Sequence, residues 1–202
     1  STAGFVDIGE EVSQLALGGT HTCALLKSGN IKCWGDNSQG QAGQISSEAI
    51  GDTELPSSVP SIFLGAKAIQ IVAGKYHTCA LLETGDVKCF GEAWGVGLGN
   101  PSGTLRKNPL NLPILSLNGR VKQLSSNSNA EHTCALLING DVNCWGFSYI
   151  YALGYLGFHG VGAYQQPSSV GVVSVGGSVL KISVGDSHTC ALMTNLEVRC
   201  WG

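Results

Sequence analysis

The sequence predicts an all-β fold built as a β-propeller-type repeat, with four blades of about four antiparallel strands each. The first observation is a repeat: HTCALLKSGNIKCWG at 21–35 returns at 77–91, 132–146 and 188–202, at spacings of 56, 55 and 56 residues. The second is that each unit contains about four short apolar segments bounded by Gly or polar turns. Segments this short and rich in Val, Ile and Leu form strands rather than helices. A period of this size is typical of propeller blades, and it leaves a closed ring or an open arc as alternatives.

The strands expected in the first unit are GFVDIG at 4–9, VSQLALG at 12–18, HTCALL at 21–26 and IKCWG at 31–35. The last two segments are apolar or small on both faces, which favours sheets packed between two neighbours. The first two segments recur more weakly in the later units. The third unit has about two extra residues before its HTCALL segment, so we expect a different loop there.

The repeat makes the chain one continuous domain, 1–202. Blade 1 occupies 1–35, and the stretches 36–91, 92–146 and 147–202 each hold a linker followed by a blade.

The segment HTCALLKSGNIKCWGDNSQGQAG resembles the repeat of the regulator of chromosome condensation family. That pattern joins a His-Ser or His-Thr and a Trp-Gly to a Gly-Gln-Leu-Gly loop, which Asn37, Gly40, Gln41 and Gly43 match here, with Ala42 in place of Leu. The resemblance implies a propeller, and family members usually close a ring of seven blades, whereas this chain holds four. It does not specify a function, since the same architecture serves exchange factors, receptor ectodomains and protein inhibitors.

All eight cysteines lie inside the repeat, in pairs ten residues apart. Gly29, Gly85 and Gly140 each stand third in a three-residue connection, the left-handed position of a type I turn with a G1 bulge. That register places the two cysteines of each unit directly opposite each other, near the separation that a disulfide spans. The predicted disulfides are Cys23–Cys33, Cys79–Cys89, Cys134–Cys144 and Cys190–Cys200. Four disulfides predict an extracellular or other oxidising compartment, with the protein secreted.

Zinc is the competing interpretation of the same residues, because His21, Cys23 and Cys33 could supply three ligands. A fourth ligand and a Cys-x-x-Cys motif are missing, which disfavours it. The simpler interpretation is that each motif histidine hydrogen-bonds a turn backbone within its own blade. We therefore predict no metal and no cofactor.

Two further positions of the repeat lead to predictions, one about the turn and one about the burial of the aromatic rings. In the fourth copy Leu196 occupies the turn position of Gly, so the hairpin must use another turn, with Asn195 in the left-handed region, or bear strain at positive φ. The residues at the Trp position of the four copies should be buried between blades; they are Trp34, Phe90, Trp145 and Trp201.

Composition and motifs exclude several classes of function. Charged residues make up 12% of the chain, the net charge is −3, and the 11 Lys and Arg residues are scattered singly, so nucleic-acid binding is not expected. No apolar run is long enough to span a membrane, and the start of the chain lacks a leader. The acidic residues are dispersed, no Gly-x-Ser-x-Gly motif occurs, and no thiol is expected to be free, which predicts that the protein is not an enzyme.

The linkers 36–56, 92–112 and 147–167 are the expected recognition segments, because propeller loops commonly bind partners. The third is rich in aromatic residues, which supply large amphipathic contact area. The simpler alternative is that several of these rings cover a blade or plug the channel. The candidate partner-binding residues are Trp94, Phe147, Tyr149, Tyr151, Tyr155, Phe158, His159 and Tyr164.

Two functions follow as hypotheses. The first is an extracellular structural or protein-interaction scaffold, including one that associates with copies of itself into an assembly or fibre. The alternative is a ligand-binding receptor ectodomain or a secreted protein inhibitor, with protein or carbohydrate as ligand. Nucleotide exchange on a small GTPase fits badly with four disulfides.

Self-association requires that the end units be covered, because uncovered apolar blade faces demand a partner. We therefore expect the first and fourth units to contact each other or neighbouring chains, and an exposed set would contradict this. The test residues are Val6, Ile8, Val12 and Leu15 in the first unit and Val173, Val175, Val179 and Ile182 in the fourth.

Overall fold

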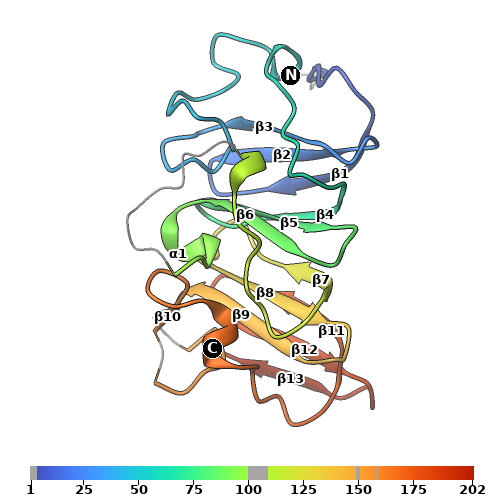
Figure 1. Cartoon of the computed structure of the whole chain (residues 1–202), viewed down its shortest axis with the longest axis vertical. Helices are drawn as coiled ribbons and strands as arrows, with labels where there is room; N and C mark the ends of the chain where they lie inside the picture. Colours follow the sequence, from blue (N-terminus) through green and yellow to red (C-terminus); the bar gives the residue numbers. More distant parts are fainter. Residues whose placement is uncertain (1–3, 100–108, 149–150, 158) are drawn as a thin grey trace.

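Four antiparallel sheets follow one another along the long axis of the computed structural model, which describes residues 4–99, 109–148, 151–157 and 159–202 (Figure 1). Their strands are β1 (Val12–Leu17), β2 (His21–Leu26) and β3 (Ile31–Gly35) in sheet 1; β4 (Ala68–Ala73), β5 (His77–Leu82) and β6 (Val87–Gly91) in sheet 2; β7 (Val121–Ser125), β8 (His132–Leu137), β9 (Val142–Phe147) and β10 (Gly160–Val161) in sheet 3; and β11 (Val179–Val184), β12 (Thr189–Met193) and β13 (Val198–Trp201) in sheet 4. The short helices are η1 (Pro56–Ser58), α1 (Ala93–Val96), η2 (Pro109–Asn111) and α2 (Pro167–Val170). The all-β prediction with four blades is confirmed.

The expected position of the first segment of each unit is wrong. In the first unit residues 4–8 form no strand. In the second unit Ile62 instead bridges to Ile31, the first residue of β3 in the preceding sheet. Leu115 likewise donates its N–H to the Val87 carbonyl of β6 at 2.8 Å. The free edge of each blade's last strand offers unpaired backbone groups, so the next segment along the chain pairs there.

A glutamine links each of the first three sheets to the next. The side chain of Gln14 donates to the carbonyl of Ile71 at 2.8 Å and accepts from the N–H of the same residue at 3.0 Å. Gln70 binds Leu124 of sheet 3 in the same way, and Gln123 binds Ile182 of sheet 4. Each glutamine therefore satisfies two backbone groups of the neighbouring blade.

The motif histidines also connect neighbouring blades, which corrects the expectation that they bond turns within their own blade. His21 Nε2 lies 2.8 Å from the hydroxyl of Thr78 in sheet 2, and that hydroxyl donates to the carbonyl of Gln41 at 2.9 Å. Because the hydroxyl proton is already used, His21 Nε2 must be the donor to Thr78. The contact recurs between His77 and Thr133 at 2.7 Å. 

The third motif histidine makes the same contact with the next blade, and the fourth does not. His132 Nε2 lies 3.0 Å from the hydroxyl of Thr189 in sheet 4. His188 is exposed, because no further sheet follows sheet 4 in the described chain. The histidine side chains are therefore buried only where a following blade covers them.

The four predicted disulfides are present, each with its two Cα atoms 4.1 Å apart. The predicted register is also correct: in sheet 1 Cys23 pairs directly with Cys33 across β2 and β3. Because both sulfur atoms are bonded to each other, neither can act as a thiolate ligand, and the zinc alternative fails for His21 and its neighbours.

The rings at the Trp position are buried to different extents. Phe90 and Trp145 are completely buried, and the Trp145 indole donates to the carbonyl of Gly95 at 2.9 Å. Trp34 and Trp201 are only partly buried. Sheets 2 and 3 have a neighbouring sheet on both sides, whereas sheets 1 and 4 have one, so the expectation holds for the two inner blades and is wrong for the two outer ones.

The two ends of the chain do not cover each other. Sheets 1 and 4 lie at opposite ends of the stack (Figure 1). In the first unit Ile8 is buried, but Val6, Val12 and Leu15 are exposed by 55%, 37% and 58%. The fourth-unit set, Val173, Val175, Val179 and Ile182, is buried. The chain itself therefore leaves the first set uncovered, because β1 has a neighbouring blade on one face only, and the expectation that the two end units contact each other is wrong. Contact of this end with neighbouring chains stays a prediction.

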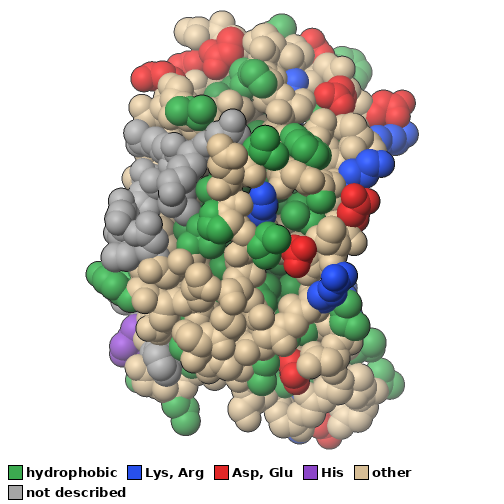
Figure 2. Space-filling view, in the orientation of Figure 1, with side chains coloured by type: hydrophobic (Ala, Val, Ile, Leu, Met, Phe, Trp, Pro, Cys, Tyr) green, Lys and Arg blue, Asp and Glu red, His purple; other side chains and the backbone are tan. Residues whose placement is uncertain are grey.

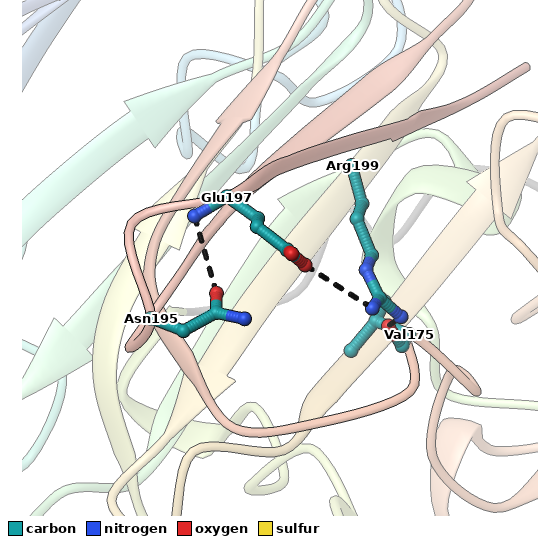
Figure 3. Close-up of polar contacts among 4 residues, drawn as sticks. All are labelled: Val175, Asn195, Glu197 and Arg199. Atoms are coloured by element: carbon teal, nitrogen blue, oxygen red, sulfur yellow. Dashed lines mark hydrogen bonds and ion pairs between the residues drawn. The ribbon is translucent and has the colours of Figure 1, made fainter.

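The last hairpin keeps the turn of its siblings despite Leu196. Leu196 adopts φ 69°, close to the φ of 83° at Gly85 in sheet 2. Asn195 does not take the left-handed position; its side chain accepts from the N–H of Glu197 at 3.1 Å (Figure 3). Glu197 in turn pairs with Arg199, which also donates to the carbonyl of Val175. Of the two expected alternatives, strain at a positive φ of Leu196 is therefore the correct one.

Replacing Leu196 by Gly should stabilise the protein by about 0.5 to 1 kcal/mol. A left-handed non-glycine residue costs about 1 to 2 kcal/mol, which exceeds the added entropy of glycine in the unfolded chain. Leu196 is 74% exposed, so little apolar burial is lost. Urea unfolding under non-reducing conditions measures the difference. Gly85→Leu is the reverse control and should destabilise the protein, and a loss of stability in Leu196→Gly would contradict the expectation.

Candidate functional site

A hollow of about 340 Å³ opens where the loops at one end of sheets 2 and 3 meet. We call it the aromatic groove. Tyr76 comes from the turn before β5, Glu131 from the loop before β8, and Phe147 ends β9. Strand β6 leads into the remaining wall through α1. The groove is lined by Tyr76, His77, Glu92, Trp94, Glu131 and Phe147.

The sequence GEAWGVG forms the α1 wall through two local effects. The Glu92 carboxylate caps the short helix by accepting the N–H groups of Trp94 at 3.0 Å and Gly95 at 3.3 Å. A Cβ atom on Gly95 would lie 2.3 Å from the ring of His77, so only glycine lets the helix rest on that buried ring. Both effects hold the Trp94 side chain and the Glu92 carboxylate at the rim of the groove.

Three of the predicted binding residues come together around the indole ring. The centroid of Trp94 lies 5.4 Å from that of Phe147, with the planes tilted by 57°, and 5.6 Å from that of Tyr164, in an edge-on contact. Tyr164 is 72% exposed, and Trp94 and Phe147 are partly buried. Linkers that lie far apart in the sequence therefore form one aromatic surface.

The other predicted residues lie elsewhere. Tyr151 and His159 are exposed and form a separate ring contact with centroids 5.4 Å apart. Tyr155 is buried; its hydroxyl accepts the N–H of Cys144 at 3.2 Å and donates to the carbonyl of Gly171 at 3.1 Å, and burial raises its pKa. Tyr155 thus packs the blade rather than presenting a surface to a partner. Tyr149 and Phe158 lie outside the described residues.

The sequence interpretation missed Tyr76, Glu92 and Glu131. Tyr76 and Glu131 stand immediately before the His-Thr of their repeats, a position that Thr20 occupies in the first unit. The signal that could have identified Tyr76 and Glu131 is that the residue before the constant His-Thr motif differs from one repeat to the next. Glu92 follows the Phe-Gly of the second unit and had no comparable signal.

A second hollow of about 290 Å³ adjoins the groove and shares Glu131 and Phe147 with it. Lys75 is its cation: its ammonium group lies 2.8 Å from the Glu131 carboxylate and 5.0 Å from the centre of the Tyr76 ring. The hydrogen bond to Glu131 raises the pKa of Lys75. The remaining lining residues are Asn129, His132, Ser148, Ala152, Asp186 and Ser187.

The two hollows together carry a net negative charge. Among the described residues that line them, three carboxylates, those of Glu92, Glu131 and Asp186, accompany one ammonium group, that of Lys75. Burial lowers the pKa of His77 to about 3 and that of His132 to about 4, so neither ring adds positive charge at neutral pH. The site therefore combines aromatic rings with unbalanced carboxylates.

Charge is otherwise dispersed. On the face drawn in Figure 2 the Lys and Arg side chains are interspersed with Asp and Glu rather than gathered in a patch. Over the described residues, no group of three or more His, Cys, Asp or Glu side chains is arranged to hold a metal ion. None of the helices in the same part of the chain has the length and apolar character needed to cross a membrane.

Comparison with known proteins agrees with this architecture. Residues 12–41, 68–92 and 179–202 match the regulator of chromosome condensation (RCC1) repeat. The ultraviolet-B receptor UVR8 of Arabidopsis thaliana is 28% identical over 201 residues, covering 96% of this chain and 42% of UVR8. The regulator of chromosome condensation of Xenopus laevis is 33% identical over 141 residues, covering 68% of this chain and 31% of that protein.

Among solved structures, yeast RCC1 (Prp20) bound to Kap60 is similar, with a TM-score of 0.68 and 25% identity over 95% of this chain and 43% of that chain. The chain thus spans less than half the length of these relatives. With its four stacked sheets, its three segments that match the RCC1 repeat and its repeated His-Thr motif, the chain is an RCC1-like repeat protein.

Proposed function

We propose that this chain is a non-enzymatic, ligand-binding protein-interaction module that works in an extracellular or other oxidising compartment. The observation that carries the proposal is the aromatic groove, a hollow built from four chain segments on a scaffold of stacked sheets. Recognition sites of proteins favour such aromatic rings because they bury large area at low entropic cost. RCC1-like propellers form a protein-interaction fold, and the solved yeast relative is bound to another protein, Kap60.

The four disulfides support the compartment. Every cysteine of the chain is paired within its own blade. Such bonds form and persist where the surroundings are oxidising and are rare in the reducing cytosol.

The chemistry of the hollows supports a non-enzymatic function. His132, Asp186 and two serines line the second hollow, a set of residue types that could suggest nucleophilic catalysis. However, His132 binds Thr189 through Nε2, and its pKa is lowered to about 4 by burial, so it is a weak base at neutral pH. The hydroxyl of Ser148 accepts the N–H of Ala152 at 2.7 Å, which gives it a structural partner.

A ligand-binding module is favoured over a self-assembling scaffold. The described residues of one chain already form the groove, so binding there needs no second copy, whereas the exposed Val6, Val12 and Leu15 are the face that a scaffold would use. A scaffold built from copies of this chain would bury that face, so the oligomeric state separates the two functions.

Photo-crosslinking tests the proposal. A photoreactive phenylalanine analogue at Tyr164, beside the groove, should yield a discrete adduct with a protein of the native extracellular fluid, which is then purified and its affinity for this chain measured. The same analogue at Ile138, an exposed turn residue at the opposite end of sheet 3, is the matched control and should yield none. Identical adducts from both positions contradict the proposal, and an adduct with a second copy, together with polymers in light scattering, favours the scaffold.

A further inference from the structure

We infer that the aromatic groove takes a cationic side chain, that of an arginine or lysine presented by a protein partner. The inference rests on the proposed function and names the chemistry of its ligand. It follows from which groups surround the hollow, how they are held, and a contact that the protein already makes with one of its own lysines.

The walls suit a cation. Trp94 and Phe147, whose rings are in contact, line the groove together with the ring of Tyr76. Aromatic faces attract ammonium and guanidinium groups through the ring quadrupole, and a tryptophan is the best of these partners. The tilt of 57° between Trp94 and Phe147 makes the two rings walls of a recess rather than one flat platform.

The carboxylates supply the complementary charge. Glu92 is held at the rim because one of its oxygens, Oε2, accepts two backbone N–H groups of α1. Glu131 lies between the two hollows and is matched by Lys75, which leaves Glu92 without a cationic partner of its own among the described side chains. A cation entering the groove would bring opposite charge to a preformed carboxylate beside the indole ring, the arrangement that favours charge-assisted hydrogen bonds.

Lys75 shows that this environment accepts an ammonium group. Its Nζ atom lies 2.8 Å from Glu131 while standing 5.0 Å from the centre of the Tyr76 ring. The pair is partly exposed at the edge of the groove, with side-chain exposures of 37% and 31%. The same combination of carboxylate and aromatic ring recurs in the groove as Glu92 and Trp94, and among the described residues no lysine or arginine lines this hollow.

The test uses the purified chain and two capped tripeptides, N-acetyl-Gly-Arg-Gly-amide and the same peptide with citrulline in place of arginine. Citrulline keeps the shape of the side chain and removes its charge. The readout is the indole N–H resonance of Trp94, which is identified by its loss in Trp94→Phe. We expect the arginine peptide to shift this resonance saturably and the citrulline peptide to leave it in place.

Charge variants sharpen the test. Glu92→Gln keeps an oxygen that can cap α1 and should weaken binding of the arginine peptide about tenfold, the worth of one charge-assisted hydrogen bond. Glu11→Gln makes the same change of net charge at an exposed site paired with Lys27 and should leave the affinity unchanged. The other indole resonances, including that of Trp145, report whether each variant is folded.

Three outcomes would overturn the inference: equal shifts with both peptides, no shift with either up to their solubility limit, or equal weakening by Glu92→Gln and Glu11→Gln. A shift produced by cello-oligosaccharides and not by the arginine peptide would overturn it in favour of carbohydrate. Failure here leaves the crosslink from Tyr164 as an independent result, so the proposed function and this inference can fail separately.

Discussion

Replacing Trp145 by Ala should lower the free energy of unfolding by about 4 kcal/mol, in the range of about 3 to 5 kcal/mol found for large aromatic residues removed from cores. Trp145 is completely buried between sheets 2 and 3. Its indole N–H donates to the carbonyl of Gly95, which the substitution would leave without that partner. Equilibrium urea unfolding of the oxidised protein, followed by circular dichroism, measures the loss.

Two variants control this expectation. Trp145→Phe keeps a ring of the kind that Phe90 places at the same repeat position, and it should cost about 1 to 2 kcal/mol through the lost hydrogen bond and the reduced volume. Trp34→Ala should cost less than Trp145→Ala, because Trp34 is only partly buried at the end of the stack. Equal losses in the two alanine variants would show that burial between blades does not decide the effect.

Acid should destabilise the protein by several kcal/mol between pH 6.5 and pH 4, through the histidines that link the blades. Burial lowers the pKa of His21 to about 4, that of His77 to about 3 and that of His132 to about 4, from 6.5 in the unfolded chain. For His21 the carboxylate of Asp36 opposes the effect of burial, and for His77 the neighbouring histidines add to it.

The direction of the effect follows from proton uptake. Below pH 6.5 the unfolded chain binds protons at these rings while the folded chain does not, so stability is fully present above pH 6.5 and falls as the pH is lowered. The loss continues until the folded rings themselves protonate near pH 4 to 3. One ring with its pKa lowered from 6.5 to about 4 accounts for about 3 kcal/mol.

The structure explains why protonation is unfavourable. His21 Nε2 already donates to Thr78, and the Nδ1 atom of His21 is buried without a hydrogen-bond partner. A proton added to Nδ1 would therefore be a buried, unpaired charge.

Urea unfolding midpoints measured from pH 7.5 to pH 4 test this expectation. His77→Gln removes one titrating ring and should make the pH dependence shallower by about one proton. His188→Gln, at an exposed ring of the same motif, is the control for the substitution itself. If His77→Gln unfolds, imidazole resonances of the native protein give the pKa values directly. Equal slopes in the native protein and in His77→Gln would contradict the expectation.

The repeat and the hairpins could be predicted because they rest on local chemistry. A ten-residue spacing of cysteines around a turn such as KSG determines the register of a hairpin, and register places Cys23 opposite Cys33 whatever lies around it. The positive φ at Leu196 was one of two local alternatives for the same reason. The family resemblance rested on motifs within single units.

Contacts between blades could not be predicted in the same way. The His-Thr motif contains both halves of a contact, but nothing local shows that His21 reaches Thr78 of the next unit rather than its own turn. Nothing local shows either that Ile62 pairs with Ile31 of the preceding blade rather than with a strand of its own blade. Contacts between residues of different units, such as these two, form only when the sheets stack.

The candidate site likewise has a part that the sequence predicted and a part that depended on the packing of the blades. The aromatic composition of the linkers pointed to Trp94, Phe147 and Tyr164, and composition is a property of the sequence alone. Which of the aromatic rings face solvent depended on packing: Tyr155 is buried, and Trp94 and Phe147 meet across two blades. The sequence by itself determined the three strands that all four units share, their hairpin registers and the disulfides, since these depend on neighbours within one unit. Only the tertiary structure decided which histidines are buried and which rings form the groove, because both require side chains from separate units to be brought together.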